Sequence, residues 1–168
     1  SALGSRAEAQ SLLKNCGIWQ DMPETVKTHF ATEAPKPVLP AAQNCLIGSN
    51  RHSLDAMVQA ARAAGWQTTL ASDHLTGDVS AAAEEILRAA KAAPKDCPIA
   101  LIFGGETTVR LVGDGRGGRN QELALRLAQR GATELTGDWL FLSGGTDGRD
   151  GPTDAAGGIA TPKTWAAI

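Results

Sequence analysis

The sequence has few cysteines, little excess charge and no long apolar run. Its formal net charge is only −2 over 168 residues, and a chain this close to neutral has no electrostatic footprint for nucleic acid. No apolar segment approaches the roughly 18–20 residues that cross a bilayer. No basic stretch followed by an apolar one begins the chain, as a secretory signal would require. We therefore expect neither a nucleic-acid partner nor a membrane partner.

The three cysteines are Cys16, Cys45 and Cys97. Their odd number and wide spacing fit neither a disulfide framework nor a CxxC metal site. We expect a cytoplasmic protein in which all three are buried or half-buried. A hydrophobic content of 42% excludes a disordered chain, and the length allows a real core.

Residues 1–42 are expected to form a helical lead-in followed by a proline-rich linker. The S-x-x-E pattern that begins at Ser5 is typical of a capping box, and Gly17 is a suitable stop for the helix it begins. Pro23 can begin a second helix as its first residue. Three prolines within residues 35–40 exclude a helix there and predict an extended linker.

Residues 43–168 are expected to form an α/β domain. Strands are predicted at 44–47, 66–72, 98–103, 107–112, 139–142 and 159–160. Helices are predicted at 53–64, 78–92 and 120–129, with a last helix that begins at Pro162. This order implies a mostly parallel sheet with helices on both faces, a Rossmann-like layering, and some antiparallel pairing by the fourth strand.

Glycine is concentrated where a ligand would bind such a sheet. Fourteen of the 19 glycines lie between residues 104 and 158. Gly104 and Gly105 follow the third predicted strand, and Gly144 and Gly145 follow the fifth. Ligands of open α/β sheets bind beyond the carboxyl ends of the strands, and glycine allows backbone to approach a ligand closely. We therefore interpret these segments as binding loops.

The first loop is GGETT at residues 104–108. Its glycine pair would expose backbone N–H groups, and Glu106 with the Thr107 and Thr108 hydroxyls would point into the crevice. The alternative is a tight turn between strands, since threonine is also a good strand former.

The second loop is GDGRGGRNQE at residues 113–122, directly before a predicted helix. It satisfies G-x-G-x-x-G, but a dinucleotide site needs an acidic residue at the end of the next strand, whereas Asp138 stands at its start. Arg116 and Arg119 beside a helix N-terminus favour an anion site instead. An ordinary surface turn is the remaining alternative.

The third loop covers residues 143–158 and holds three carboxylates, Asp147, Asp150 and Asp154. Such a loop can coordinate Mg²⁺, orient a hydroxyl or act as a base. Its spacing does not fit an EF-hand. A solvated acidic turn is the alternative, but loops this long are usually functional.

Together these loops resemble one family. GGETTV at 104–109, GRGGRNQELAL at 115–125 and GTDGRDGPTDAAG at 145–157 resemble the MOFRL region of the class II glycerate kinases, which are also named hydroxypyruvate reductases of tartrate catabolism. IGSNRHSLDA at 47–56 and the W-x-x-x-P at Trp19 are similar to the family as well. The resemblance covers nearly the whole chain.

The resemblance implies a glycerate 2-kinase that transfers phosphate from ATP to the 2-hydroxyl of D-glycerate, with Mg²⁺, in a cleft between two domains. Such kinases are more than twice this length. We therefore expect a C-terminal fragment, inactive when isolated, whose MOFRL-like residues 98–168 supply one wall of the site. Its partners would be glycerate, a nucleotide and the missing N-terminal domain, and a homo-oligomer is compatible with the sequence.

We infer residue roles from this resemblance together with the chemistry of the loops. The expected catalytic residues are Arg119, Asp147 and Asp154. The expected metal ligands are Asp147 and Asp150. Substrate or phosphate is expected to contact Gly104, Gly105, Glu106, Thr107, Arg116, Gly117, Gly118, Asn120 and Thr146. Two alternatives stay open: a hydroxypyruvate reductase using NAD(P)H, for which the sequence shows no nicotinamide site, and a non-catalytic ligand-binding module.

Overall fold

The computed structural model describes residues 4–32, 41 and 43–168. The chain divides into two units, residues 1–45 and 46–168. The predicted linker at 35–40 lies outside the described residues. No helix of the described part is both long enough and apolar enough to span a membrane.

The first unit contains α1 (Arg6–Asn15), a short 3₁₀ helix η1 (Trp19–Asp21) and α2 (Glu24–Ala31). The predicted capping box at Ser5 is confirmed: its hydroxyl accepts from the Glu8 backbone N–H, and the Glu8 carboxylate accepts from the Ser5 N–H. Pro23 precedes α2 as its N-cap rather than as its first residue. The Arg6 guanidinium joins α1 to α2 by donating to the carbonyls of His29 and Thr32.

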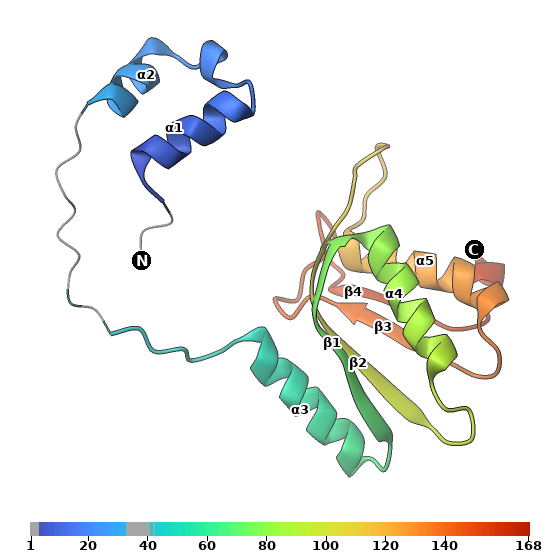
Figure 1. The fold of residues 1–168 in the computed structure, drawn as a ribbon. Helices are drawn as coiled ribbons and strands as arrows, with labels where there is room; N and C mark the ends of the chain where they lie inside the picture. Colours follow the sequence, from blue (N-terminus) through green and yellow to red (C-terminus); the bar gives the residue numbers. More distant parts are fainter. Residues whose placement is uncertain (1–3, 33–40, 42) are drawn as a thin grey trace. The chain divides into compact units, whose positions relative to one another are not determined.

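The second unit alternates helices and strands (Figure 1). In chain order its elements are α3 (Asn50–Ala63), β1 (Gln67–Asp78), α4 (Val79–Ala92), β2 (Ile99–Thr108), α5 (Arg119–Glu134), β3 (Phe141–Gly144), β4 (Gly157–Ala160) and the 3₁₀ helix η2 (Trp165–Ala167). β1 pairs with β2 in parallel, and β3 pairs with β4 antiparallel, as two separate two-stranded sheets. The predicted α/β class is confirmed.

Helices cover both faces of the β1–β2 sheet (Figure 1). Phe103 of β2 packs against the buried cluster, whose members other than Leu75 come from α4 and α5. A Cβ on the next residue, Gly104, would lie 2.6 Å from Leu54 of α3. Since successive strand residues point to opposite faces, α3 lies on one face and α4 on the other.

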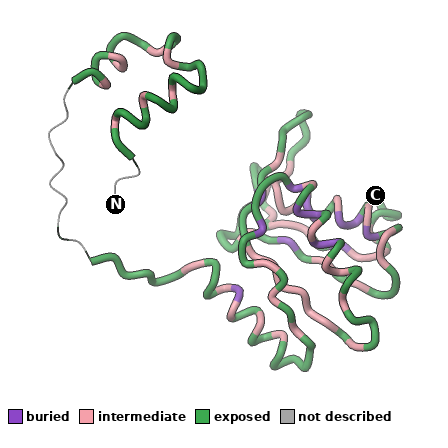
Figure 2. Tube along the Cα trace, viewed as in Figure 1, coloured by how far each residue is buried: buried purple, intermediate pink, exposed green. Residues whose placement is uncertain are grey.

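The core lies between β1, α4 and α5, where most of the residues coloured as buried in Figure 2 are found. It consists of Leu75, Val79, Ala82, Ala83, Ile86, Leu87, Leu123 and Leu127. Its α4 members follow the helical spacing expected from the sequence. Each fully buried leucine contributes about 1.5–3 kcal/mol, so this cluster holds the N-terminal half of α5 in place.

Two predicted strands are wrong among the described residues. Residues 107–108 end β2 in parallel register with β1 instead of beginning an antiparallel strand, and residues 109–118 belong to no strand or helix. The reason is that β1 ends at Asp78, which caps α4 by accepting from the Ser80 N–H, and so offers β2 no further partner. Residues 44–47 are also outside any strand, with Leu46 and Ile47 mostly exposed.

Two smaller expectations also fail. Cys16 and Cys45 are exposed, while only Cys97 is half-buried as expected. The helix predicted from Pro162 is limited to the short η2.

Candidate functional site

A broad groove of about 2090 Å³ is lined by residues of α3, β1, α4, β2, α5 and β3 and their connecting loops. Eight of the predicted site residues line it: Gly104, Gly105, Glu106, Thr107, Arg119, Asn120, Thr146 and Asp147. Small-molecule pockets usually have about 300–1,000 Å³. The groove is therefore an open side of the unit rather than a closed active site.

Two charged residues from different predicted loops meet in this groove. Glu106 lies near the end of β2, and Arg119 is the first residue of α5. The Arg119 Nη2 atom lies 3.0 Å from the Glu106 Oε1 atom. Both side chains are exposed, at 38% for Arg119 and 74% for Glu106. An ion pair this exposed adds little stability. Its structural effect is to hold the Arg119 guanidinium at the groove.

Asp150 is in a different environment from the other two aspartates of its loop. Its side chain is buried, with the residue 2% exposed. Oδ1 accepts from the backbone N–H and the side-chain amide of Asn120, at 3.0 and 3.1 Å. Oδ2 accepts from the backbone N–H and the side-chain amide of Gln121, at 2.8 and 3.2 Å. Four donors therefore surround one carboxylate at the first turn of α5.

These hydrogen bonds decide the ionisation of Asp150. Burial by itself raises the pKa of its carboxyl group, but the four N–H groups of Asn120 and Gln121 outweigh burial and hold the pKa below its usual value. The carboxylate is charged at neutral pH. It accepts hydrogen bonds from the backbone N–H groups at the start of α5. From the sequence we expected these groups to bind the anion of a ligand.

Two glycines allow this carboxylate to approach the helix. A Cβ on Gly118 would overlap the Asp150 side chain, and a Cβ on Gly151 would overlap the carbonyl oxygen of Gly117. Gly151 also has φ +63°, in the left-handed region. At these two positions glycine allows two segments of the same chain to pack closely. From the sequence we expected glycine to allow a ligand to approach instead.

Asn120 connects Asp150 to the end of β3. The Ser143 hydroxyl donates to Asn120 Oδ1 at 2.7 Å. On the other side, the Gln121 side-chain amide also donates to the Thr153 hydroxyl at 2.9 Å. The end of β3, the start of α5 and the 145–156 loop thus form one hydrogen-bonded unit. Within the described residues, every buried side-chain nitrogen and oxygen has a partner.

The remaining predicted residues divide between the groove and its surroundings. Asp147 is exposed in the groove, and its Oδ1 accepts from the Arg149 N–H at 3.2 Å. Arg116 donates to the Pro152 carbonyl at 2.8 Å. Residues that do not appear in the lining of the groove are Arg116, Gly117, Gly118, Asp150 and Asp154.

Few side chains in the described residues could act as ligands of a metal ion. The described residues contain no group of three or more histidine, cysteine, aspartate or glutamate side chains that could hold a metal ion. Mg²⁺ is often held by only one or two carboxylates together with substrate phosphates. Asp147 fits that requirement, whereas the acceptor positions of Asp150 face four protein donors.

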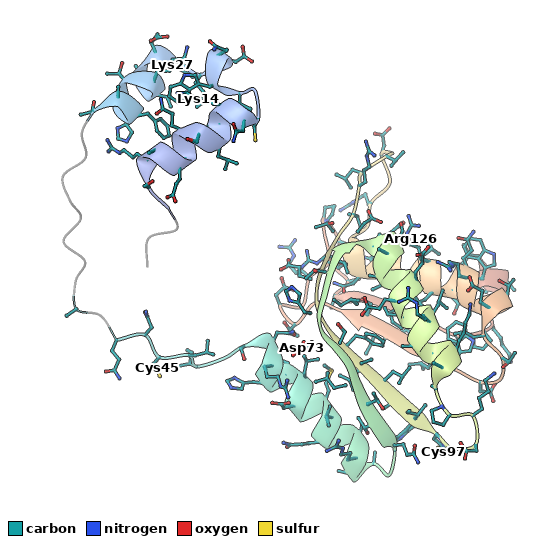
Figure 3. All side chains as sticks on the ribbon, in the orientation of Figure 1. Lys14, Lys27, Cys45, Asp73, Cys97 and Arg126 are labelled. Carbon is teal, nitrogen blue, oxygen red and sulfur yellow. The ribbon has the colours of Figure 1, made fainter. Side chains whose placement is uncertain are left out.

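Several groove residues were not among the predicted site residues. Four polar examples are Asn50, Asp73, His74 and Thr76. Asp73 lies inside β1, beyond the strand predicted at 66–72. Its carbonyl accepts from Asn50 Nδ2 at 3.2 Å, and its carboxylate pairs with Arg51 at 3.5 Å (Figure 3). The signal for these residues was weak because the sequence does not show that β1 continues to Asp78.

The neighbouring Gly48-Ser49-Asn50-Arg51 segment forms the start of α3, three residues before the predicted start at 53. The Ser49 hydroxyl caps α3 by accepting from the His52 N–H.

Comparison with known proteins shows which family this chain is similar to. Residues 99–168 match the sequence profile of the MOFRL family. A glycerate 2-kinase from Pyrococcus horikoshii is 36% identical over 94% of this chain and 38% of its own length. A D-glycerate 2-kinase from Thermotoga maritima is 38% identical over 96% of this chain and 39% of its own length. A crystal structure of glycerate kinase from Thermotoga maritima superposes with a TM-score of 0.72 and 36% identity, covering 96% of this chain and 39% of that one.

These matches define residues 99–168 as a MOFRL region on an α/β fold. Over 90% or more of its length the chain is similar to glycerate kinases. It spans about 38% of the length of the curated relatives it matches.

Proposed function

We propose that this chain is part of a glycerate 2-kinase, which transfers phosphate from ATP to the 2-hydroxyl of D-glycerate, and that the groove forms one wall of the active site. The observation that carries the proposal is the position of Arg119. This arginine, predicted from the sequence to bind an anion, lies in the groove beside Glu106 and six other predicted site residues.

The chemistry of the groove suits small anions. Phosphoryl transfer depends mainly on positioning and on neutralising charge. A guanidinium can bind the glycerate carboxylate or the transferring phosphoryl group through two parallel hydrogen bonds. Glu106 limits the side-chain freedom of Arg119 and keeps it at the groove before substrate arrives.

We propose Asp147 as the ligand that this chain supplies to Mg²⁺. Its carboxylate is exposed in the groove, near the backbone of Gly144, Gly145 and Thr146 that also lines it. When bound with ATP, the metal would neutralise phosphate charge. Asp154 is exposed and does not appear in the lining of the groove, so its part in catalysis stays a prediction.

We also propose that a further domain of a longer cytoplasmic protein covers the groove. The groove is open. Leu111 and Val112, in the segment after β2, are 86% and 91% exposed. The cross-strand pair Leu142 and Ile159 is 66% and 61% exposed. Apolar surface that is exposed and contiguous usually marks an interaction site, and the isolated chain is then expected to be inactive.

The test compares a protein of the relatives' length with the 168-residue chain alone. ATP-dependent formation of 2-phosphoglycerate is expected from the longer protein only. Oxidation of NADH with hydroxypyruvate, in the absence of ATP and without kinase activity, would overturn the proposal. Turnover by the 168-residue chain would overturn the requirement for a covering domain.

A further inference from the structure

We propose that Asp150 is a positioning residue: its carboxylate occupies the N-terminus of α5 as a built-in anion and thereby holds Arg119 at the groove. The effect on catalysis rests on the proposed kinase function. The built-in anion itself does not depend on that function.

The first observation is that α5 lacks a cap of its own. The first backbone N–H groups of a helix need acceptors from outside the helix, and a side chain at the N-cap normally supplies one. The N-cap of α5 is Gly118, which has no side chain to do so. Asp150 supplies both acceptors from 30 residues further along the chain, one oxygen to each of the Asn120 and Gln121 backbone N–H groups.

The second observation is that the chain packs closely around Asp150, at two glycines that have no space for a side chain. Asp150 contacts the Cα side of Gly118 so closely that a Cβ there would overlap it. Directly after Asp150, the left-handed backbone of Gly151 lies against the Gly117 carbonyl. A charge at a helix N-terminus is also stabilised by the helix dipole. The carboxylate therefore occupies the place where an external anion would otherwise bind.

The third observation is the connection to Arg119, which stands between Gly118 and Asn120. Gly118 is packed against Asp150, and Asn120 is held by Asp150 on one side and by the Ser143 hydroxyl on the other. The backbone that carries Arg119 is thus fixed at both ends, and its guanidinium reaches Glu106. Asp150 does not line the groove, so any effect on a substrate passes through the groove residues that it positions, Arg119 and its neighbour Asn120.

This arrangement changes how the groove can bind an anion. The N–H groups of Asn120 and Gln121 already have a carboxylate acceptor. At the start of α5, an incoming carboxylate or phosphate therefore meets the Arg119 side chain rather than these two N–H groups.

The test uses Asp150→Ala, which leaves four donors facing a space of the size of a small carboxylate. Formate added to this variant is expected to raise its unfolding temperature in a saturable way, beyond the effect of chloride at equal ionic strength. Formate is also expected to restore the protection of the Asn120 and Gln121 amides in hydrogen exchange. Wild type and Asp114→Ala, which removes an exposed carboxylate, are expected to show no formate-specific rise. An equal response in all three proteins, or none in the folded Asp150→Ala chain, would overturn the proposal.

A second variant decides the question if Asp150→Ala does not fold. Asp150→Asn keeps the size of the side chain but removes its charge and brings an NH₂ group toward N–H donors. The Asn120 and Gln121 amides are expected to exchange faster than in wild type, and formate is expected to give no rescue because the space is filled. Exchange at the wild-type rate would overturn the proposal.

The catalytic arm uses the longer protein in which we place this chain. In that protein Asp150→Ala is expected to displace Arg119 and so to raise the KM for glycerate by roughly 10- to 100-fold. Added formate is expected to lower the KM again. A merely structural role would instead reduce the amount of active enzyme and lower kcat at unchanged KM. If the wild-type protein shows no kinase activity, the proposed function fails, whereas the formate experiment still decides the role of Asp150.

Discussion

The Glu106 carboxylate at the end of β2 and the Arg119 guanidinium at the start of α5 lie 3.0 Å apart at the groove. The two residues are 13 positions apart in the sequence and are connected by a segment without helix or strand for residues 109–118. Their contact brings together two of the loops in which the sequence concentrates glycine and charge.

Arg119→Ala is expected to reduce activity far more than stability. In the longer enzyme we expect kcat/KM for glycerate to fall by roughly 100- to 1,000-fold, as when a charge-stabilising donor is lost. The free energy of unfolding should change by less than about 1 kcal/mol, because the ion pair is exposed. Steady-state kinetics and urea unfolding measure the two quantities.

Arg126→Ala is the matched control for that experiment. Arg126 lies on the same helix, is 40% exposed, forms an ion pair with Glu122 and does not appear in the lining of the groove (Figure 3). Its loss should leave kcat/KM within a few-fold of wild type. Similar kinetic losses in both variants would contradict a specific role for Arg119.

Glu106→Gln should increase the affinity of the groove for inorganic phosphate. In the wild-type chain the Glu106 carboxylate competes with an incoming anion for the Arg119 guanidinium, and the amide removes that negative charge. We expect the dissociation constant to fall several-fold in isothermal titration calorimetry at low salt. The gain should disappear in the double variant with Arg119→Ala, and a gain that persists there would show that the anion binds elsewhere.

Gly151→Ala and Gly148→Ala should separate backbone strain from steric overlap. Both glycines have positive φ, +63° and +81°, so each substitution should cost about 1–2 kcal/mol from the backbone alone. Only at Gly151 would the added Cβ overlap another part of the chain, the Gly117 carbonyl, whereas Gly148 has open space. Urea unfolding should therefore show a clearly larger loss for Gly151→Ala, and equal losses would contradict the packing described for the start of α5.

The stability of the chain should depend on Glu134 at low pH. Hydrogen bonds from Arg130 and then Lys91 lower the pKa of Glu134 to about 2. Because the folded pKa lies below the unfolded value of about 4.3, the stabilisation is complete above the unfolded pKa and is lost as pH falls toward 2. The difference in unfolding free energy between wild type and Glu134→Gln should be constant above about pH 5 and shrink below it. A difference that does not vary with pH would contradict this assignment.

Local features of the chain could be predicted well from the sequence. The capping box at Ser5, the helix predicted at 78–92 and the helix that follows the arginine-containing loop depend on spacing within a few residues. The structure has all three. The failed strands at 44–47 and 107–112 have suitable residues, but a strand also needs a neighbour to accept its hydrogen bonds, and the sequence does not show where β1 ends.

For the candidate site too, local features could be predicted from the sequence, and contacts between distant segments could not. By itself, the sequence determined which residue types are gathered after which strands, because hydrophobic periodicity and glycine content are local properties. It did not distinguish Asp147, Asp150 and Asp154, which have similar neighbours in one glycine-rich loop. Only the tertiary structure decided that Asp150 is buried against Gly118 and bonded to the start of α5, while the other two are exposed. The physical reason is that burial of a carboxylate requires several N–H donors at one point, and folding brings those donors from a segment 30 residues away.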